Sequence, residues 1–196
     1  MKKIILLITT SLFLFSCDAD NESKTKDPQK TSDQVEKVHK TDSVKEKAEF
    51  EALQDLEDRL MNNDLTIDIK VAKDLYAKAL SFSKNYPTST NLEKALDYAA
   101  KGAENGGMYK EAVEMYHQLG VVLPESNKTP IYMYEKGKVL EDKMQNKEAA
   151  KAAYKELIKR FPRNPLSKDM KSYLKNGVID MTKEEKISYY EEKSKI

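Results

Sequence analysis

The sequence predicts an all-α fold in which antiparallel helix pairs stack into an array (an α-solenoid). Three observations lead to this prediction. Only six of the 196 residues are glycine, 34% are charged, and Lys, Glu, Ala and Leu are abundant, which favours helices over sheets. Apolar residues recur at helical spacing, with prolines between the helical segments. A motif also recurs with a period of 37 to 38 residues.

The composition excludes several classes of function. The 34 basic and 33 acidic residues nearly cancel, so the chain lacks the basic excess of a nucleic-acid-binding protein. A single cysteine excludes an internal disulfide framework and a multi-cysteine metal site. The two histidines, His39 and His117, are far apart in the sequence, and neither has other ligand residues grouped around it. We therefore expect no metal, no cofactor and no nucleic-acid partner.

Residues 1–16 predict a lipoprotein signal peptide. Lys2 and Lys3 precede an uncharged run, residues 4–16, that is 13 residues long. Such a run is shorter than the stretch of about 20 residues that spans a membrane, and it has the length of a signal-peptide core. An ordinary cleaved signal, or a cysteine buried in an apolar helix, is the alternative interpretation.

The run ends in Leu14-Phe15-Ser16-Cys17, which resembles the lipobox of bacterial lipoproteins. The resemblance implies that the signal is cleaved before Cys17 and that this cysteine is acylated. Several acyl chains hold a protein far more firmly than one. The acidic residues that follow, Asp18, Asp20 and Glu22, resemble either an enterobacterial inner-membrane retention signal or a Bacteroidetes signal for outer-membrane display. The Lys-rich, Trp-free composition favours the second, so we expect a Gram-negative outer membrane, facing the periplasm or the surface.

Residues 17–43 are expected to form the lipidated N-terminus and a disordered linker. The apolar side chains of the linker are Ala19, Val35 and Val38, and Pro28 stands in its middle. So few apolar side chains cannot offset the entropy of ordering the chain. About 26 flexible residues would reach roughly 30 Å, which would hold the folded part away from the bilayer.

Residues 44–196 are expected to form the helical domain, with a degenerate first unit at 44–88, firm units at about 91–126 and 130–165, and C-terminal helices at 165–194. The apolar residues of the first helix share one face: Phe50, Leu53, Leu56 and Leu60. Outside the linker, every proline falls at an expected helix border: Pro87, Pro124, Pro130, Pro162 and Pro165. A motif in the two firm units reads Ala112-x3-Tyr116-x7-Pro124 and Ala150-x3-Tyr154-x7-Pro162.

On these residues the segment from about 91 to 165 resembles two tetratricopeptide (TPR) repeats. In that family, helix A carries a small residue where the helices cross, and helix B carries an alanine and an aromatic residue. The corresponding repeat-core residues here are Ala100, Ala112, Tyr116, Gly137, Ala150 and Tyr154. Gly107 matches the turn between the helices of one unit. The other unit has Gln145-Asn146 there and is one residue longer before its second helix.

The end of the second unit, residues 147–166, resembles TPR lipoproteins of the bacterial envelope, such as barrel-assembly and Tol–Pal-associated proteins, and most closely those of Bacteroidetes. TPR arrays bind extended peptides or partner helices along their A helices. The resemblance places such a groove at Lys94, Asp97, Lys101 and Glu104 in one unit, and at Ile131, Tyr134, Lys138 and Glu141 in the other. The alternative is that these residues are only solvated helix positions.

No catalytic motif is found, so we expect no enzyme. The chain has no G-x-S-x-G elbow, no Gly-rich phosphate loop and no H-E-x-x-H sequence. Mixed Glu/Lys stretches such as residues 183–195 are expected to be solvated helix faces. The leading hypothesis is a lipid-anchored envelope scaffold or adaptor that binds a protein or peptide. The alternative is a glycan- or small-ligand-binding envelope lipoprotein.

Overall fold

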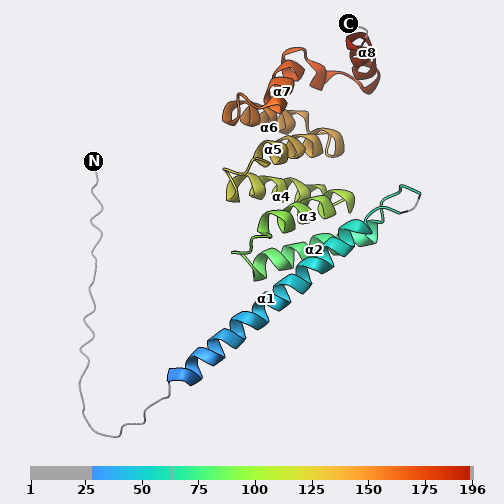
Figure 1. The fold of residues 1–196 in the computed structure, drawn as a ribbon. Helices are drawn as coiled ribbons and strands as arrows, with labels where there is room; N and C mark the ends of the chain where they lie inside the picture. Colours follow the sequence, from blue (N-terminus) through green and yellow to red (C-terminus); the bar gives the residue numbers. More distant parts are fainter. Residues whose placement is uncertain (1–27, 63, 195–196) are drawn as a thin grey trace, which may run out of the picture. The chain divides into compact units, whose positions relative to one another are not determined.

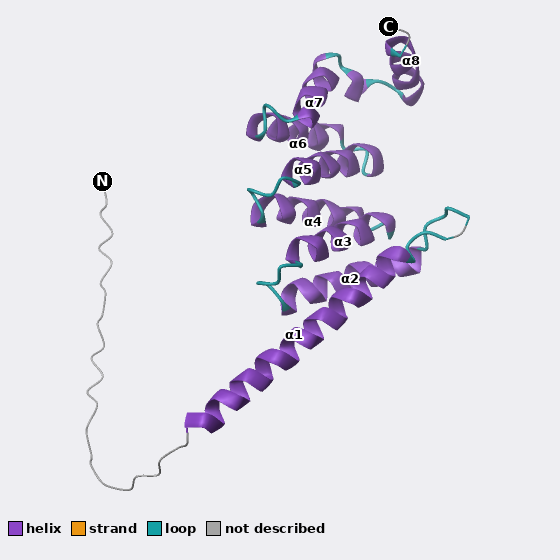
Figure 2. Ribbon diagram, in the orientation of Figure 1, coloured by secondary structure: helices purple, strands orange, loops and turns teal. Residues whose placement is uncertain are grey.

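A computed structural model describes residues 28–62 and 64–194, and in these ranges the chain is helical apart from its turns and one isolated β-bridge (Figure 1). The helices are α1 (Pro28–Asp58), α2 (Ile69–Asn85), α3 (Leu92–Asn105), α4 (Tyr109–Val122), α5 (Thr129–Lys138), α6 (Lys147–Arg160), α7 (Pro165–Lys175) and α8 (Lys183–Lys193). A π-helical turn, η1 (Val139–Lys143), follows α5, and a 3-10 turn, η2 (Val178–Asp180), precedes α8. These residues confirm the predicted all-α class (Figure 2). None of the described helices has both the length and the apolarity needed to cross a bilayer.

Helix α1 begins at Pro28, inside the stretch that was expected to be a disordered linker. Residues 28–43 are described as helix, whereas the signal peptide, Cys17 and the rest of the linker lie outside the described residues. A shortage of apolar side chains prevents burial but does not prevent a helix. Lys, Glu and Gln are good helix formers, and extending a helix that is already nucleated costs little. The chain divides after His39 into two units, and every contact described below lies within the second.

From α2 to α7 each helix packs against the next, so the helices follow one another as the pairs α1–α2, α3–α4 and α5–α6 (Figure 1). We call the first helix of each pair helix A and the second helix B. Helix α1 joins this array through Phe50, whose ring centroid lies 5.6 Å from that of Phe82 in α2 and 6.3 Å from that of Tyr98 in α3. These separations are typical of packed aromatic pairs.

Each helix B ends in the same way. The residues after the three B helices have φ from −128° to −124° and ψ from 58° to 61°: Tyr86, Leu123 and Phe161. Their N–H groups donate to carbonyl oxygens four residues earlier, over 2.9 to 3.2 Å: Phe82, Leu119 and Leu157. A proline follows each of these three residues. Because a proline disfavours the helical conformation of the residue before it, each helix B ends at this point. The degenerate first unit therefore ends its second helix as the two firm units do.

All six repeat-core residues are buried: Ala100, Ala112, Tyr116, Gly137, Ala150 and Tyr154. In the second firm unit, the backbone of α5 at Gly137 lies directly against the Tyr154 ring of α6. A Cβ atom at that position would lie only 2.2 Å from Cε1 of the Tyr154 ring. Helices α5 and α6 therefore cross at a distance that only glycine permits.

Candidate functional site

The predicted groove residues lie on the A helices of the second and third pairs. Helix α3 carries Lys94, Asp97, Lys101 and Glu104, and α5 with η1 carries Ile131, Tyr134, Lys138 and Glu141. We call these eight residues the A-helix face. Their spacing keeps each series on one side of its helix, and all but Glu141 are exposed or half-buried. The hydroxyl of Tyr132 on α5 donates to Glu93 of α3 over 3.0 Å, which ties the two A helices together.

The charges of the α3 half are matched within the protein. The Lys101 ammonium lies 3.2 Å from Asp97 and 3.8 Å from Glu57 of α1. The ammonium of Lys94 lies 5.0 Å from the centroid of the Tyr98 ring. Such partly exposed ion pairs contribute at most about 1 kcal/mol each, so this half offers polar contacts without a strong net field.

The tyrosine of each firm helix B holds a glutamate on the A-helix face. The hydroxyl of Tyr116 donates to Glu104 over 3.0 Å, and that of Tyr154 donates to Glu141 over 3.1 Å. Burial raises the pKa of both tyrosines far above the ordinary value, and the neighbouring glutamates raise it further. Both hydroxyls therefore remain protonated at physiological pH and act as permanent hydrogen-bond donors.

The π turn η1 absorbs the extra residue of the second unit. The two glutamates are 37 residues apart, whereas the two tyrosines are 38 apart. Within η1 the N–H of Met144 donates to the carbonyl of Val139 over 3.0 Å, a bond that spans five residues. Gln145 then takes a φ of 54° at the turn position where Gly107 has 76°. The same hydroxyl-to-carboxylate bond is thereby kept in both units, although their lengths differ. Such π turns are frequent at functional sites.

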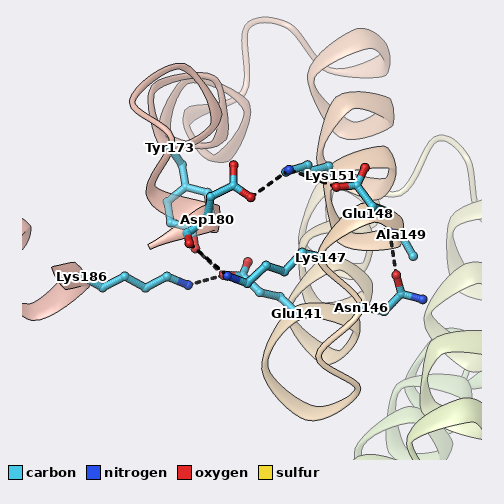
Figure 3. Close-up of polar contacts among 9 residues, drawn as sticks. All are labelled: Glu141, Asn146, Lys147, Glu148, Ala149, Lys151, Tyr173, Asp180 and Lys186. Carbon is cyan, nitrogen blue, oxygen red and sulfur yellow. Dashed lines mark hydrogen bonds and ion pairs between the residues drawn. The ribbon is translucent and has the colours of Figure 1, made fainter. Parts of the chain in front are cut away.

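Glu141 is the most enclosed acidic side chain of the A-helix face, and its side chain is 6% exposed. In addition to Tyr154, it accepts hydrogen bonds from the Tyr173 hydroxyl of α7 and from the Lys186 ammonium of α8, the latter over 2.5 Å (Figure 3). A buried carboxylate is costly unless it is paired and hydrogen-bonded, and here three helices supply its donors. Burial raises the pKa of Tyr173, and the hydrogen bond to Glu141 raises it further.

Two clefts lie beside the Lys186–Glu141 contact. The first, which we call the aromatic cleft, has a volume of about 300 Å³ and is lined chiefly by Tyr134, Met170, Tyr173, Tyr189, Tyr190 and Lys193. The second has a volume of about 540 Å³ and is lined by both members of that contact and by Asp142, Gln145, Lys147 and Lys183. A protein segment lying across α5, α7 and η1 would contact the aromatic rings of the first cleft and the charged side chains of the second.

Sequence reasoning missed the part that α8 plays at this site. Residues 183–195 were expected to be a solvated helix, and indeed no residue of α8 is buried. Lys186 nevertheless reaches Glu141, and the Asn176 side-chain amide donates to the Tyr189 hydroxyl over 2.8 Å. A Glu/Lys helix has the same sequence pattern whether or not one of its side chains contacts another helix, so no signal in the sequence could have revealed this.

No cluster of three His, Cys, Asp or Glu side chains suited to a metal ion occurs in residues 28–62 and 64–194. His117 lies beside Lys136, with 3.5 Å between Nδ1 and the ammonium nitrogen. The predicted lipidation site, Cys17, lies outside the described residues.

Comparison with known proteins bears on the third helix pair. A family model of the tetratricopeptide repeat matches residues 132–164, which include Gly137, Ala150, Tyr154 and the whole of η1. No curated protein matches the chain. Residues 132–164 are therefore similar to a tetratricopeptide repeat, a repeat that generally mediates protein–protein interaction.

Proposed function

We propose that this chain is a lipid-anchored adaptor of the bacterial envelope that binds a segment of another protein along its A-helix face. The observation that carries the proposal is the aromatic cleft of about 300 Å³ at Tyr134. Half-exposed aromatic side chains on a rigid helical frame are the residues that most often anchor a protein partner. The tyrosine-to-glutamate bonds of both units stiffen the same face.

Photo-crosslinking in the native host tests this use of the A-helix face. A photoreactive amino acid is placed at Tyr134 or at Asp97, and at Glu114 of α4 as an exposed control on a B helix. We expect the first two positions to capture the same protein, and we expect Glu114 not to capture it. Equal capture from all three positions, or capture from none, contradicts the proposal.

The lipid anchor is supported by the signal-like residues 1–16 and by the lipobox resemblance at Cys17. Replacing Cys17 with Ser removes the thiol that would be acylated. We expect this variant to accumulate as an unprocessed precursor and to incorporate no labelled palmitate, while the native chain is labelled and sediments with membranes. A Cys17→Ser chain that matures and sediments like the native one rules out this anchor.

A second candidate function is the binding of a glycan or another small ligand. The aromatic cleft favours it, because its volume lies at the lower end of the range for small-molecule sites and its tyrosine rings suit a sugar face. A ligand held there would raise the melting temperature by an amount set by its concentration relative to Kd. Absence of any shift with peptidoglycan fragments, together with specific protein crosslinks, leaves the adaptor as the function.

A further inference from the structure

Helix α8 contacts the A-helix face in the way a bound ligand would. Its Lys186 ammonium contacts the buried carboxylate of Glu141 and lies 5.6 Å from the centroid of the Tyr173 ring. One turn later, Tyr189 and Tyr190 line the aromatic cleft together with Tyr134. A basic side chain at Glu141, followed by aromatic rings, therefore occupies the place where the adaptor proposal puts a partner.

Apolar burial does not hold α8 firmly. It has no buried residue, and Tyr190 is 52% exposed although it borders the cleft. The helix also starts without help from the rest of the domain. Thr182 and Glu185 form a reciprocal capping box, with N–H donors at 2.7 and 3.2 Å from the side-chain oxygens. Since little apolar surface would be exposed, lifting α8 off the face costs little hydrophobic free energy.

The chain just before α8 is anchored, so α8 can move without unfolding its neighbours. Val178 and Ile179 are buried in η2. The Lys147 ammonium donates to the Asp180 carbonyl over 3.1 Å, and the Lys151 ammonium lies 2.9 Å from the Asp180 carboxylate (Figure 3). Only the extended backbone at Met181 separates this fixed point from the capping box.

We propose that α8 is an internal, displaceable occupant of the partner site, and that the partner is a protein segment with a lysine or arginine followed three or four residues later by an aromatic side chain. This proposal rests on the proposed adaptor function. When α8 leaves, Glu141 keeps its two tyrosine donors but loses its cation. An enclosed carboxylate without a counter-charge is strongly unfavourable, so a segment that displaces α8 must supply a cation of its own.

The spacing of the partner's side chains follows from α8 itself. Residues three and four apart lie on the same side of a helix, so Lys186 and the pair Tyr189 and Tyr190 face the site together. The second cleft holds Glu141 and Asp142 together with three lysines, two of which, Lys183 and Lys186, leave with α8. Two carboxylates then face the single ammonium of Lys147, so acidic segments are disfavoured. A partner must also compete with a helix that is covalently attached and present at high effective concentration. The apparent dissociation constant is therefore the intrinsic one divided by the fraction of chains in which α8 is released.

A unique fluorophore can report the position of α8 in the full chain, since the native sequence has no tryptophan. In a Tyr190→Trp background, Lys186 is changed to Glu or to Ala, and Glu191→Lys serves as a control charge reversal at an exposed residue of the same helix that lines neither cleft. We expect quenching by acrylamide to increase about twofold or more with either Lys186 change and to stay near the parent value with Glu191→Lys. Thermal unfolding of each variant checks that the domain remains folded. Unchanged quenching in both Lys186 variants would show that the Lys186–Glu141 contact does not keep α8 on the A-helix face, and would refute the proposal.

The partner chemistry is tested with a capped peptide that has the sequence of residues 183–193. We expect it to bind the Lys186→Glu chain about tenfold or more tightly than the native chain, because the site is then free. The same peptide with Ala at its second basic position, the one corresponding to Lys186, should lose this binding. Equal binding of both peptides, or binding of neither to the released chain, overturns the requirement for a basic residue.

The crosslinking at Tyr134 separates failure of this inference from failure of the adaptor function. If Lys186→Glu increases the yield of the same captured protein, both proposals are supported. If the protein is captured with unchanged yield while quenching shows that α8 is released, the adaptor function stands and α8 is not a competitor. If neither chain captures a protein from Tyr134, the adaptor function itself fails.

Discussion

Replacing Gly137 with Ala should destabilise the domain far more than a methyl group usually does. The new Cβ would lie 2.2, 2.6 and 2.9 Å from Cε1, Cδ1 and Cζ of the Tyr154 ring. That ring is 2% exposed, with ring centroids of Tyr134 at 6.2 Å and Tyr173 at 6.1 Å. It therefore cannot move aside without disturbing both of these rings and its own bond to Glu141.

The magnitude follows from three effects. Overpacking a core costs about 1–3 kcal/mol, and straining or losing a hydrogen bond to a charged group costs about 1.5–3 kcal/mol. Alanine is a better helix former than glycine by about 1 kcal/mol, which offsets part of the loss. We expect a net loss of about 3 kcal/mol in the free energy of unfolding, and a fall in melting temperature of roughly 6–12 °C.

Gly120→Ala is the matched control for this experiment. Gly120 is also a buried helical glycine, but a Cβ there would meet nothing closer than 3.7 Å. We expect this variant to gain about 0.5–1 kcal/mol through helix propensity and reduced freedom of the unfolded chain. Urea unfolding followed by circular dichroism measures both. If Gly137→Ala costs less than about 0.5 kcal/mol, the close crossing of α5 and α6 is wrong.

Three further outcomes are expected. Gln145→Gly should stabilise the domain by about 0.5–1 kcal/mol in urea unfolding, because it removes a left-handed non-glycine residue, whereas Gly107→Gln should destabilise it. Tyr154→Ala should lower the free energy of unfolding by roughly 3–5 kcal/mol, because it removes a core ring, and Tyr154→Phe should lower it by about 1–3 kcal/mol, because it removes only the hydroxyl. A larger loss for Tyr154→Phe than for Tyr154→Ala would contradict a buried ring. Burial raises the pKa of the Glu135 carboxyl group. The folded state therefore binds the proton of this carboxyl group more tightly than the unfolded state does. As a result, the contribution of Glu135 to stability falls as pH rises above the ordinary pKa of a glutamate. Glu135→Gln should therefore be more stable than the native chain at neutral pH, with the difference vanishing in acid, and a difference that is independent of pH would refute the shift.

The repeat units could be predicted because their signals are local. Each firm unit carries an alanine, a tyrosine and a proline at fixed spacing, and each of these residues has a defined place within one helix or at its end. Pro124 and Pro162 mark the ends of α4 and α6, and Tyr116 and Tyr154 are buried. The extra residue of the second unit was also visible in the spacing, but its absorption by the π turn η1 was not. Whether an inserted residue lengthens a loop or widens a helix depends on the neighbouring helices that the turn must fit.

The beginning of α1 was predicted wrongly for a related reason. Composition indicates whether a stretch can be buried, and residues 28–43 contain too few apolar side chains for that. A helix that extends from a packed segment needs no burial of its own, because each added residue forms one hydrogen bond at little cost. The packed segment here begins around Phe50, and α1 extends before it to Pro28.

The sequence by itself determined the helical class and the places where the B helices end, because helix periodicity and proline placement act within a few positions of one another. It did not single out Gly102, where α3 lies so close to α2 that a Cβ atom would come within 2.6 Å of the Tyr76 backbone nitrogen. Only the tertiary structure decided that Glu141 is enclosed and that Lys186, 45 residues later, supplies its cation. That contact joins two surface-type residues of opposite charge, and the chain offers 34 basic and 33 acidic residues from which such pairs could form. Coulomb attraction alone does not choose among so many pairs. The choice is made by the packing of α5, α6 and α7, by the π turn that places Glu141, and by the anchored turn at Asp180 that directs α8 towards it.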